Sequence, residues 1–197
     1  MKTLNQYIQE KLIVNKDYRD AGLSPKSFKE LRKIIEQRYK EKGPGTEQNP
    51  IDFNDIDVSG IKTLGIYTGS PNAIGLFEKI EFDYIDISDW DVSNVTDISG
   101  VFYECKNLKS IGDLSRWDVS KVENMERTFY RCYKLESIGD LSKWDVSKVE
   151  SMISMFAHCK TLTSVGDLSN WDVSNVKYMS YMFHVSGIKN TPSWYKV

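Results

Sequence analysis

The chain has 197 residues, which is enough for one elongated domain or for one domain with an appendage. Its composition, 40% hydrophobic and 27% charged, is that of an ordinary soluble globular protein. The net charge of −2 gives no electrostatic reason to expect binding to nucleic acid or to an anionic membrane. The charge is uneven, because residues 1–50 carry 11 Lys and Arg against 7 Asp and Glu, whereas residues 51–197 carry 15 against 21.

The N-terminal residues predict two helices. Apolar residues at helical spacing indicate an amphipathic helix over residues 3–13. A second helix is expected to begin with Ser24 as its N-cap and Pro25 in the first helical position. It carries one apolar stripe and ends before Gly43-Pro44-Gly45. The stripe consists of Phe28, Leu31, Ile34, Ile35 and Tyr39.

The opposite face of the second predicted helix is basic. Two interpretations of this face remain open, a solvated helix surface and a docking surface for a partner protein. The face consists of Lys26, Lys29, Arg32, Lys33, Arg38 and Lys40.

A repeated phrase dominates the rest of the chain. The sequence W-D-V-S-x-V occurs four times, and each copy starts 27 residues after the previous one. A fixed period of this length is typical of proteins built from stacked repeats. Several other positions recur with the same period, and we call each such set of equivalent residues a column. The columns include Trp90/Trp117/Trp144/Trp171, Ile98/Met125/Met152/Met179, Phe102/Phe129/Phe156/Phe183, Cys105/Cys132/Cys159 and Leu108/Leu135/Leu162.

The repeats also set the predicted domain boundaries. Residues 1–45 are expected to form a helical segment and residues 46–197 the repeat domain. Asp57-Val58-Ser59 matches the repeated phrase with a longer offset, so the first repeat is interpreted as degenerate. The last repeat departs from the pattern after Phe183 and is interpreted as a C-terminal cap. The predicted units are 51–89, 90–116, 117–143, 144–170 and 171–197.

Within each repeat we predict a short helix, a turn and a short strand. Val122, Met125 and Phe129 have the spacing of one helix face, while Leu135 and Ile138 suit a short extended segment. One repeat cannot bury its apolar side alone, so the repeats should stack. The predicted fold class is α/β, a leucine-rich-repeat-like solenoid of about five 27-residue units with short helices and short parallel strands, preceded by two N-terminal helices.

The three cysteines occupy one column, Cys105, Cys132 and Cys159. An odd number at this spacing is typical neither of a disulfide framework nor of a zinc site. Cysteine often behaves as a small buried hydrophobe, which predicts a reduced ladder inside the core. Metal or redox chemistry is the alternative.

Two columns of aspartate are the best candidates for a metal site. Stacked carboxylates could hold Ca²⁺, which prefers oxygen ligands. Alternatively, each aspartate accepts a hydrogen bond from its own backbone in a turn, as short acceptor side chains do. The glycine-rich nonapeptide of calcium-binding repeat proteins is absent, which favours the structural role, and we predict no cofactor. The columns are Asp91/Asp118/Asp145/Asp172 and Asp113/Asp140/Asp167.

No catalytic motif stands out in the sequence. The serines of the repeated phrase have no histidine in phase with them, because the only histidines are His158 and His184. No nucleotide-binding or metalloprotease motif occurs either. The sequence therefore predicts a protein that is not an enzyme.

The columns that vary between repeats are expected to face solvent. They contain Tyr, Arg and His, a mixture that resembles the composition of binding surfaces, although an ordinary solvated surface is the alternative. A protein or a glycan is the expected partner, and the oligomeric state is left open. The candidate partner-binding residues are Tyr103, Arg127, Tyr130, Arg131, His158 and Tyr181.

The repeats resemble the BspA-like family of bacterial leucine-rich-repeat proteins. The resemblance is strongest in W-D-V-S-K-V-E-S-M-I-S-M-F at residues 144–156 and in W-D-V-S-N-V-K-Y-M-S-Y-M-F at residues 171–183. It implies a binding or adhesion protein without catalysis, of a kind found on host-associated bacteria and mycoplasmas and encoded by phages of gut bacteria. A structural component of a virion or other assembly, docking through the N-terminal helices, is the alternative function.

The expected location follows from the lack of targeting segments. No apolar run of about 18 residues predicts a membrane span, and the N-terminus lacks the apolar stretch and cleavage site of a secretory signal. The sequence therefore predicts a cytoplasmic or virion-associated protein without membrane insertion, and a cell-surface location only through another export route.

Overall fold

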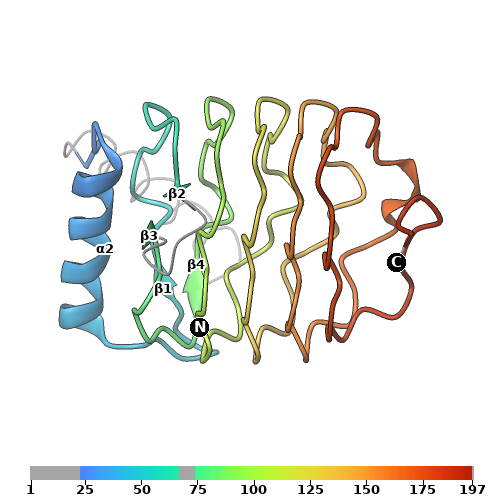
Figure 1. Ribbon diagram of the computed structural model, residues 1–197. Coiled ribbons are helices and arrows are strands. Elements are labelled where there is room, and N and C mark those ends of the chain that lie inside the picture. Colours follow the sequence, from blue (N-terminus) through green and yellow to red (C-terminus); the bar gives the residue numbers. More distant parts are fainter. Residues whose placement is uncertain (1–22, 67–73, 197) are drawn as a thin grey trace, which may run out of the picture.

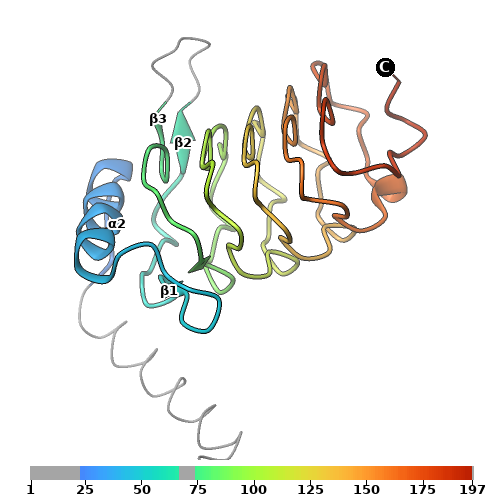
Figure 2. The ribbon, with the colours of Figure 1, turned by 90° about the horizontal axis from the view of Figure 1, so that it is seen from below.

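The computed structural model describes residues 23–66 and 74–196. Each repeat forms one irregular coil of the chain, and successive coils stack side by side (Figure 1). Helix α2 (Phe28–Lys42) covers one end of the stack, and the C-terminal residues lie at the other end (Figures 1 and 2). No helix in these described ranges is long and apolar enough to cross a membrane.

Regular secondary structure is sparse in the described residues. Successive coils pair through isolated parallel bridges, for example between Asn124 and Ser151 and between Ser110 and Ser137. Two-residue strands occur only in the first part of the stack, where β1 pairs with β4 in parallel and β2 pairs with β3 antiparallel. The strands are β1 (Ile51–Asp52), β2 (Gly65–Ile66), β3 (Ile74–Gly75) and β4 (Ile85–Asp86), and a 3-10 helix, η1, spans Leu168–Asn170.

The predicted α/β solenoid of about five units, each with a short helix and a short parallel strand, is wrong. In residues 23–66 and 74–196 the one α-helix is α2, which precedes the repeats, and the one parallel strand pair is β1–β4. Of the two predicted N-terminal helices, the one over residues 3–13 lies outside the described residues. The other begins at Phe28 with Ser27 as its N-cap, three residues after the predicted start.

Hydrogen bonds between residues three apart explain why the helix prediction failed. The N–H of Thr128 donates to the carbonyl of Met125, and the N–H of Cys132 donates to that of Phe129. A run of such turns directs roughly every third side chain inward, as a helix does. The backbone between these turns donates instead to the next coil, as the N–H of Met125 does to Ser151. The apolar spacing was therefore real, but it does not distinguish a helix from consecutive turns.

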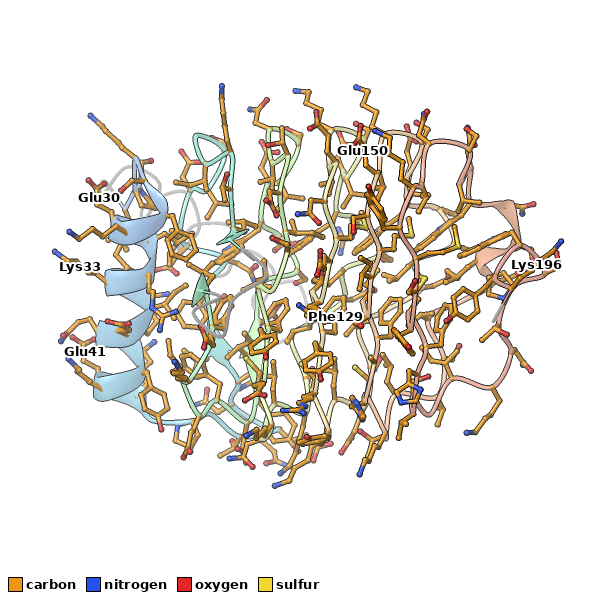
Figure 3. The ribbon with its side chains drawn as sticks, viewed as in Figure 1. Glu30, Lys33, Glu41, Phe129, Glu150 and Lys196 are labelled. Atoms are coloured by element: carbon orange, nitrogen blue, oxygen red, sulfur yellow. The ribbon has the colours of Figure 1, made fainter. Side chains whose placement is uncertain are left out.

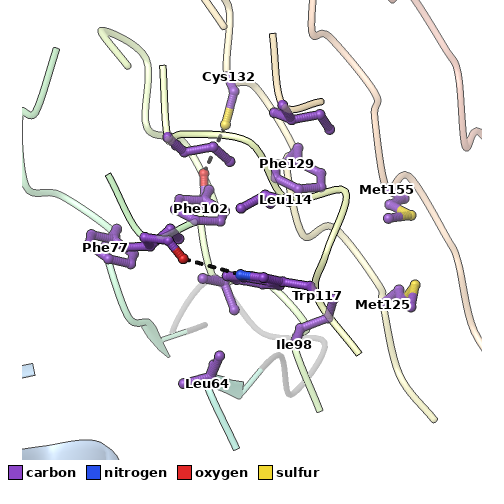
Figure 4. Close-up of a cluster of buried hydrophobic side chains, with 14 of the residues drawn as sticks. Leu64, Phe77, Ile98, Phe102, Leu114, Trp117, Met125, Phe129, Cys132 and Met155 are labelled. Carbon is purple, nitrogen blue, oxygen red and sulfur yellow. Dashed lines mark hydrogen bonds between the residues drawn. The ribbon is translucent and has the colours of Figure 1, made fainter. Parts of the chain in front are cut away.

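The core consists of ladders of identical side chains that run through the stack. The ring of Phe129, which Figure 3 labels, lies parallel to those of Phe102 and Phe156, with centroid separations of 5.5 Å on each side. The indole N–H of Trp117 donates to the carbonyl of Ile87 in the preceding coil, at 3.2 Å (Figure 4). The same bond recurs from Trp144, at 2.9 Å to Leu114. Each tryptophan thus packs in the core while its single donor is satisfied.

Helix α2 caps the first coils of the stack. Its residues Leu31 and Ile35 are fully buried against the core. The guanidinium of Arg32 donates to the carbonyls of Gly75 and Glu78, which would otherwise face the open end. Arg38 likewise donates to the carbonyl of Asp52 and pairs with a carboxylate. Two of the basic residues predicted to lie on a solvent or docking face therefore bind the stack itself.

Candidate binding surface

The structure brings all six predicted binding residues into one continuous strip across the coils. The rings of Tyr103 and Tyr130 stack with centroids 5.3 Å apart, and Tyr130 meets His158 edge to face at 5.6 Å. His158 contacts His184 at 5.5 Å, and His184 contacts Tyr181 at 5.6 Å. We call this set, with its two arginines, the aromatic strip; it comprises Tyr103, Arg127, Tyr130, Arg131, His158, Tyr181 and His184.

Two arginines lie over the ring of Tyr130. The guanidinium carbons of Arg131 and Arg127 lie 5.1 Å and 5.8 Å from its centroid, which is within the range of cation–π attraction. Arg131 also pairs with Glu104 of the preceding coil at 2.6 Å. Sequence reasoning did not select Glu104 or His184, although both occupy columns that contain selected residues. Their positions in those columns could have identified them.

The backbone of the strip is left-handed at two positions in each coil. Arg127 and Tyr181 have φ values of 55° and 61°, and Arg131 and His158 have values of 60° and 65°. Gly100 occupies the first of these two columns with a φ of 63°. Non-glycine residues seldom adopt this conformation, because Cβ then approaches the following carbonyl oxygen. Residues of the strip therefore adopt a backbone conformation that glycine would adopt at a lower cost in free energy.

The sequence predicted that the variable columns face solvent, but some of their residues are buried. Ser154 is only 6% exposed and Ala157 only 1% exposed, whereas Tyr181 in the column of Ser154 is 64% exposed. Only the large members of the variable columns therefore reach solvent.

The charges in the strip are set by local contacts. Burial, and then the neighbouring Glu104, raise the pKa of the Tyr103 hydroxyl. Burial acts to raise the pKa of Glu104 itself, but the hydrogen bond from Arg131 and the charge of Lys106 lower it overall. Burial, together with His184 and Arg131, lowers the pKa of His158 and favours its neutral imidazole at pH 7. The strip thus presents arginine charge beside the neutral rings of Tyr103 and His158.

The aspartate columns cap turns of the coils. The carboxylate of Asp118 accepts from the N–H of Ser120 at 3.1 Å, and that of Asp140 accepts from the N–H of Ser142 at 2.9 Å. The predicted turn-capping role is confirmed by these bonds, which recur at the other members of both columns. Across residues 23–66 and 74–196, no three His, Cys, Asp or Glu side chains lie close enough together to hold a metal ion.

Glycine precedes each aspartate of the second column for a steric reason. Gly139 has a φ of 87°, and a Cβ at this position would lie 1.8 Å from the carboxylate oxygen of Asp113 in the preceding coil. The Gly-Asp pair therefore lets successive caps approach one another along the stack.

We expect the stability of the stack to fall in acid. Hydrogen bonds from the following serines lower the pKa values of Asp118, Asp140, Asp145, Asp167 and Asp172. A depressed pKa in the folded state contributes stability above the unfolded value of about 3.9, and this contribution disappears as the pH falls through the folded value. The free energy of unfolding in urea should stay level from pH 7 to about pH 5 and then decline below about pH 4.

Two carboxyls act in the opposite sense, since burial raises the pKa of Asp97 and of Glu126. An Asp140→Asn variant provides the control, because asparagine keeps the acceptor oxygen but does not titrate. Its stability should depend less on pH than that of the wild type. Stability that stays level or rises between pH 5 and pH 3 would contradict the assignment of these caps.

Comparison with known proteins gives one family. The family model described as "Mycoplasma protein of unknown function, DUF285" matches residues 72–194, which is more than half of the chain. No curated protein and no solved structure matches. The matched range covers the tryptophan, phenylalanine and cysteine ladders and the whole aromatic strip. The chain belongs to this family, Mycoplasma protein of unknown function, DUF285.

Proposed function

We propose that the protein is a non-catalytic scaffold that binds a protein or glycan partner through the aromatic strip. The observation that carries this proposal is the continuous contact of Tyr103, Tyr130, His158, His184 and Tyr181 across the coils. Aromatic side chains and arginine are the residues that most often dominate binding energy at interfaces. Here they rest on a backbone held by hydrogen bonds between coils, so little conformational entropy would be lost on binding.

The left-handed backbone supports the same conclusion. A non-glycine residue in this conformation costs roughly 1–2 kcal/mol, and glycine would avoid that cost. The chain nevertheless has Arg127 in the column of Gly100, and it has Arg131 and His158 in the other left-handed column. The ion pair of Arg131 with Glu104 is partly exposed and offsets about 0–1 kcal/mol at most. Retaining these side chains therefore suggests a role beyond folding.

The chemistry of the strip indicates the kind of partner. The ring faces of tyrosine and histidine suit the apolar face of a sugar or an apolar peptide side chain. The arginines suit carboxylates, which occur both in acidic sugars and in proteins. The resemblance of the repeats to the BspA-like family points the same way, because known members of that family are mostly binding or adhesion proteins.

A second candidate function is docking into a virion or another assembly through α2. The observation that favours it is that Lys26, Lys29, Lys33 and Lys40 remain exposed near or on the helix while its arginines bind the stack. Substituting these lysines with glutamate should then abolish co-assembly and leave the binding of a strip ligand unchanged.

The variant Arg131→Gly separates binding from folding. Glycine suits the φ of 60° at this position, so the gain in backbone energy should largely offset the lost ion pair and ring contact. We expect the melting temperature to change by no more than about 4 °C, which corresponds to about 1 kcal/mol in a chain of this size. Retention on glycan arrays and on immobilised host surface proteins should fall at least tenfold, as expected for an interface arginine.

The matched control is Lys121→Gly, which removes an exposed lysine that hydrogen-bonds Asn94 away from the strip. It should bind as the wild type does. If the Arg131→Gly variant and a Tyr130→Ala variant each retained full binding, the aromatic strip would not be the binding site. A substrate turned over by the protein would overturn the non-catalytic assignment.

A further inference from the structure

Backbone hydrogen bonds join the coils in two directions: one regular set donates toward the C-terminal end, and single bonds such as that from Glu123 to Thr96 donate to the preceding coil. In each coil of the central stack, four alternate N–H groups donate to carbonyls of the coil that follows. The N–H of Met152 donates to Tyr178, and that of Ser154 donates to Ser180. In the preceding coil, the N–H of Arg131 donates to Ala157 at 2.9 Å. The stack therefore has a donor edge directed toward its C-terminal end.

Within residues 23–66 and 74–196, no further coil receives the four equivalent donors of the last of these coils. Its equivalent residues are Met179, Tyr181, Phe183 and Val185. None of their N–H groups donates to any acceptor within residues 23–66 and 74–196. Unpaired N–H groups in a row are what an extended segment needs in order to add to an edge.

The surface around these donors is hollow, partly apolar and basic. A cavity of about 710 Å³ lies between these donors and the C-terminal residues. Met179, Tyr181 and Phe183 line its apolar part, and the exposed Val185 lies beside them. Its charged lining residues are Lys177 and Lys196, with no carboxylate among them, and Lys196 lies at this end of the stack (Figure 3).

A second copy of this chain does not fit the edge. Two copies meeting through the same edge would place N–H groups against N–H groups. A head-to-tail arrangement would need free carbonyls at the other end of the stack. There, however, Arg32 of α2 already donates to the carbonyls of Gly75 and Glu78. The occupant must instead bring its own free carbonyls.

We propose that this C-terminal edge binds an extended, acidic peptide segment of a partner protein, which adds as the next coil. Four of its carbonyls accept from Met179, Tyr181, Phe183 and Val185, and apolar side chains fill the cavity over Met179. A carboxylate pairs with Lys177, as Glu150 does from the preceding coil at 2.9 Å. This edge is a second binding surface, which shares Tyr181 and His184 with the end of the aromatic strip but binds through backbone N–H groups rather than through rings.

The natural probe is a synthetic peptide with the sequence of residues 149–158, V-E-S-M-I-S-M-F-A-H. Within the stack this segment supplies the carbonyls of Ser151, Ile153, Met155 and Ala157 to the donors of the coil before it. Amide hydrogen exchange of the full chain, read residue by residue by NMR, gives the result. Without peptide, the four edge amides should exchange at least tenfold faster than the amides of Met152, Ser154, Phe156 and His158.

Saturating peptide should slow the four edge amides at least tenfold and leave the others unchanged. A peptide with the same residues in scrambled order should protect none of them. The variant Lys177→Glu should weaken binding severalfold, and a peptide with lysine in place of its glutamate should restore it. Lys148→Glu, at an exposed lysine of a central coil, is the matched control and should bind as the wild type does.

Three results would overturn the proposal. Equal protection by the scrambled peptide would show that the edge does not select a coil-like segment. Unchanged exchange at millimolar peptide would show that the edge accepts none. Protection that appears without peptide and grows with protein concentration would assign the edge to self-association instead.

Discussion

Replacing Phe129 with alanine should lower the free energy of unfolding by about 3–5 kcal/mol. The ring is 1% exposed and stacks on both sides, at 5.5 Å from Phe102 and 5.5 Å from Phe156. Its loss leaves a cavity between two rings that are held by their own coils, so the surroundings can collapse only partly. The hydrogen bonds between coils hold that spacing fixed. Equilibrium unfolding in urea, monitored by tryptophan fluorescence, measures the change.

Phe183→Ala is the matched control for this prediction. Phe183 is 7% exposed and stacks on Phe156 on one side only, while Tyr195 meets it edge to face on the other. It belongs to the last coil, where the neighbouring side chains are less constrained. Its removal should therefore cost clearly less than that of Phe129. Equal costs at the two positions would show that stacking from both sides does not govern the stability of the ladder.

The columns of the sequence predicted which residues form the core, but not the path of the backbone between them. Trp117, Phe129 and Cys132 are all buried, as the 27-residue period required. Side chains spaced by three residues fit a helix and a run of turns equally well, and the choice depends on hydrogen bonds to neighbouring coils. Local propensity contains no information about those bonds. The left-handed residues, such as Arg131, were unforeseeable for the same reason.

The aromatic strip could be assembled from the sequence because residues in one column lie next to each other when repeats stack. Tyr103 and Tyr130 are 27 residues apart and stack at 5.3 Å. The repeat period alone does not predict contacts between residues of different columns. The pairing of Arg131 with Glu104 and the role of Arg32 as a cap on carbonyls depend on side-chain directions. Composition had suggested only a basic helix face.

Replacing Cys132 with aspartate should lower the free energy of unfolding by more than about 4 kcal/mol. The side chain is 0% exposed, and its thiol donates to the carbonyl of Phe102 at 3.1 Å (Figure 4). A carboxylate there would face that carbonyl oxygen without a donor, within the apolar ladder. Cys132 lies in a central coil, so both neighbouring interfaces would be disturbed.

The controls separate charge from volume at this position. Cys132→Ala removes one small buried group and should cost only on the order of 1 kcal/mol. Burial would raise the pKa of the new carboxyl, so its penalty relative to Cys132→Ala should shrink as the pH falls from 7 toward 4. If the difference in unfolding free energy between the two variants stayed constant across that range, water would reach the side chain at this position.

Thiol reactivity tests the same ladder in the unmodified protein. Burial raises the pKa of Cys132 well above its usual range and that of Cys159 to about 12, so little nucleophilic thiolate exists at pH 8. A bulky thiol reagent should therefore modify Cys105, Cys132 and Cys159 only at the rate at which the stack unfolds. Adding urea should accelerate all three together, because each coil holds its neighbours in place. Rapid modification of Cys132 in the native protein would mean that the cysteine column faces solvent. The same coils position the aromatic strip, so its described geometry would then be wrong as well.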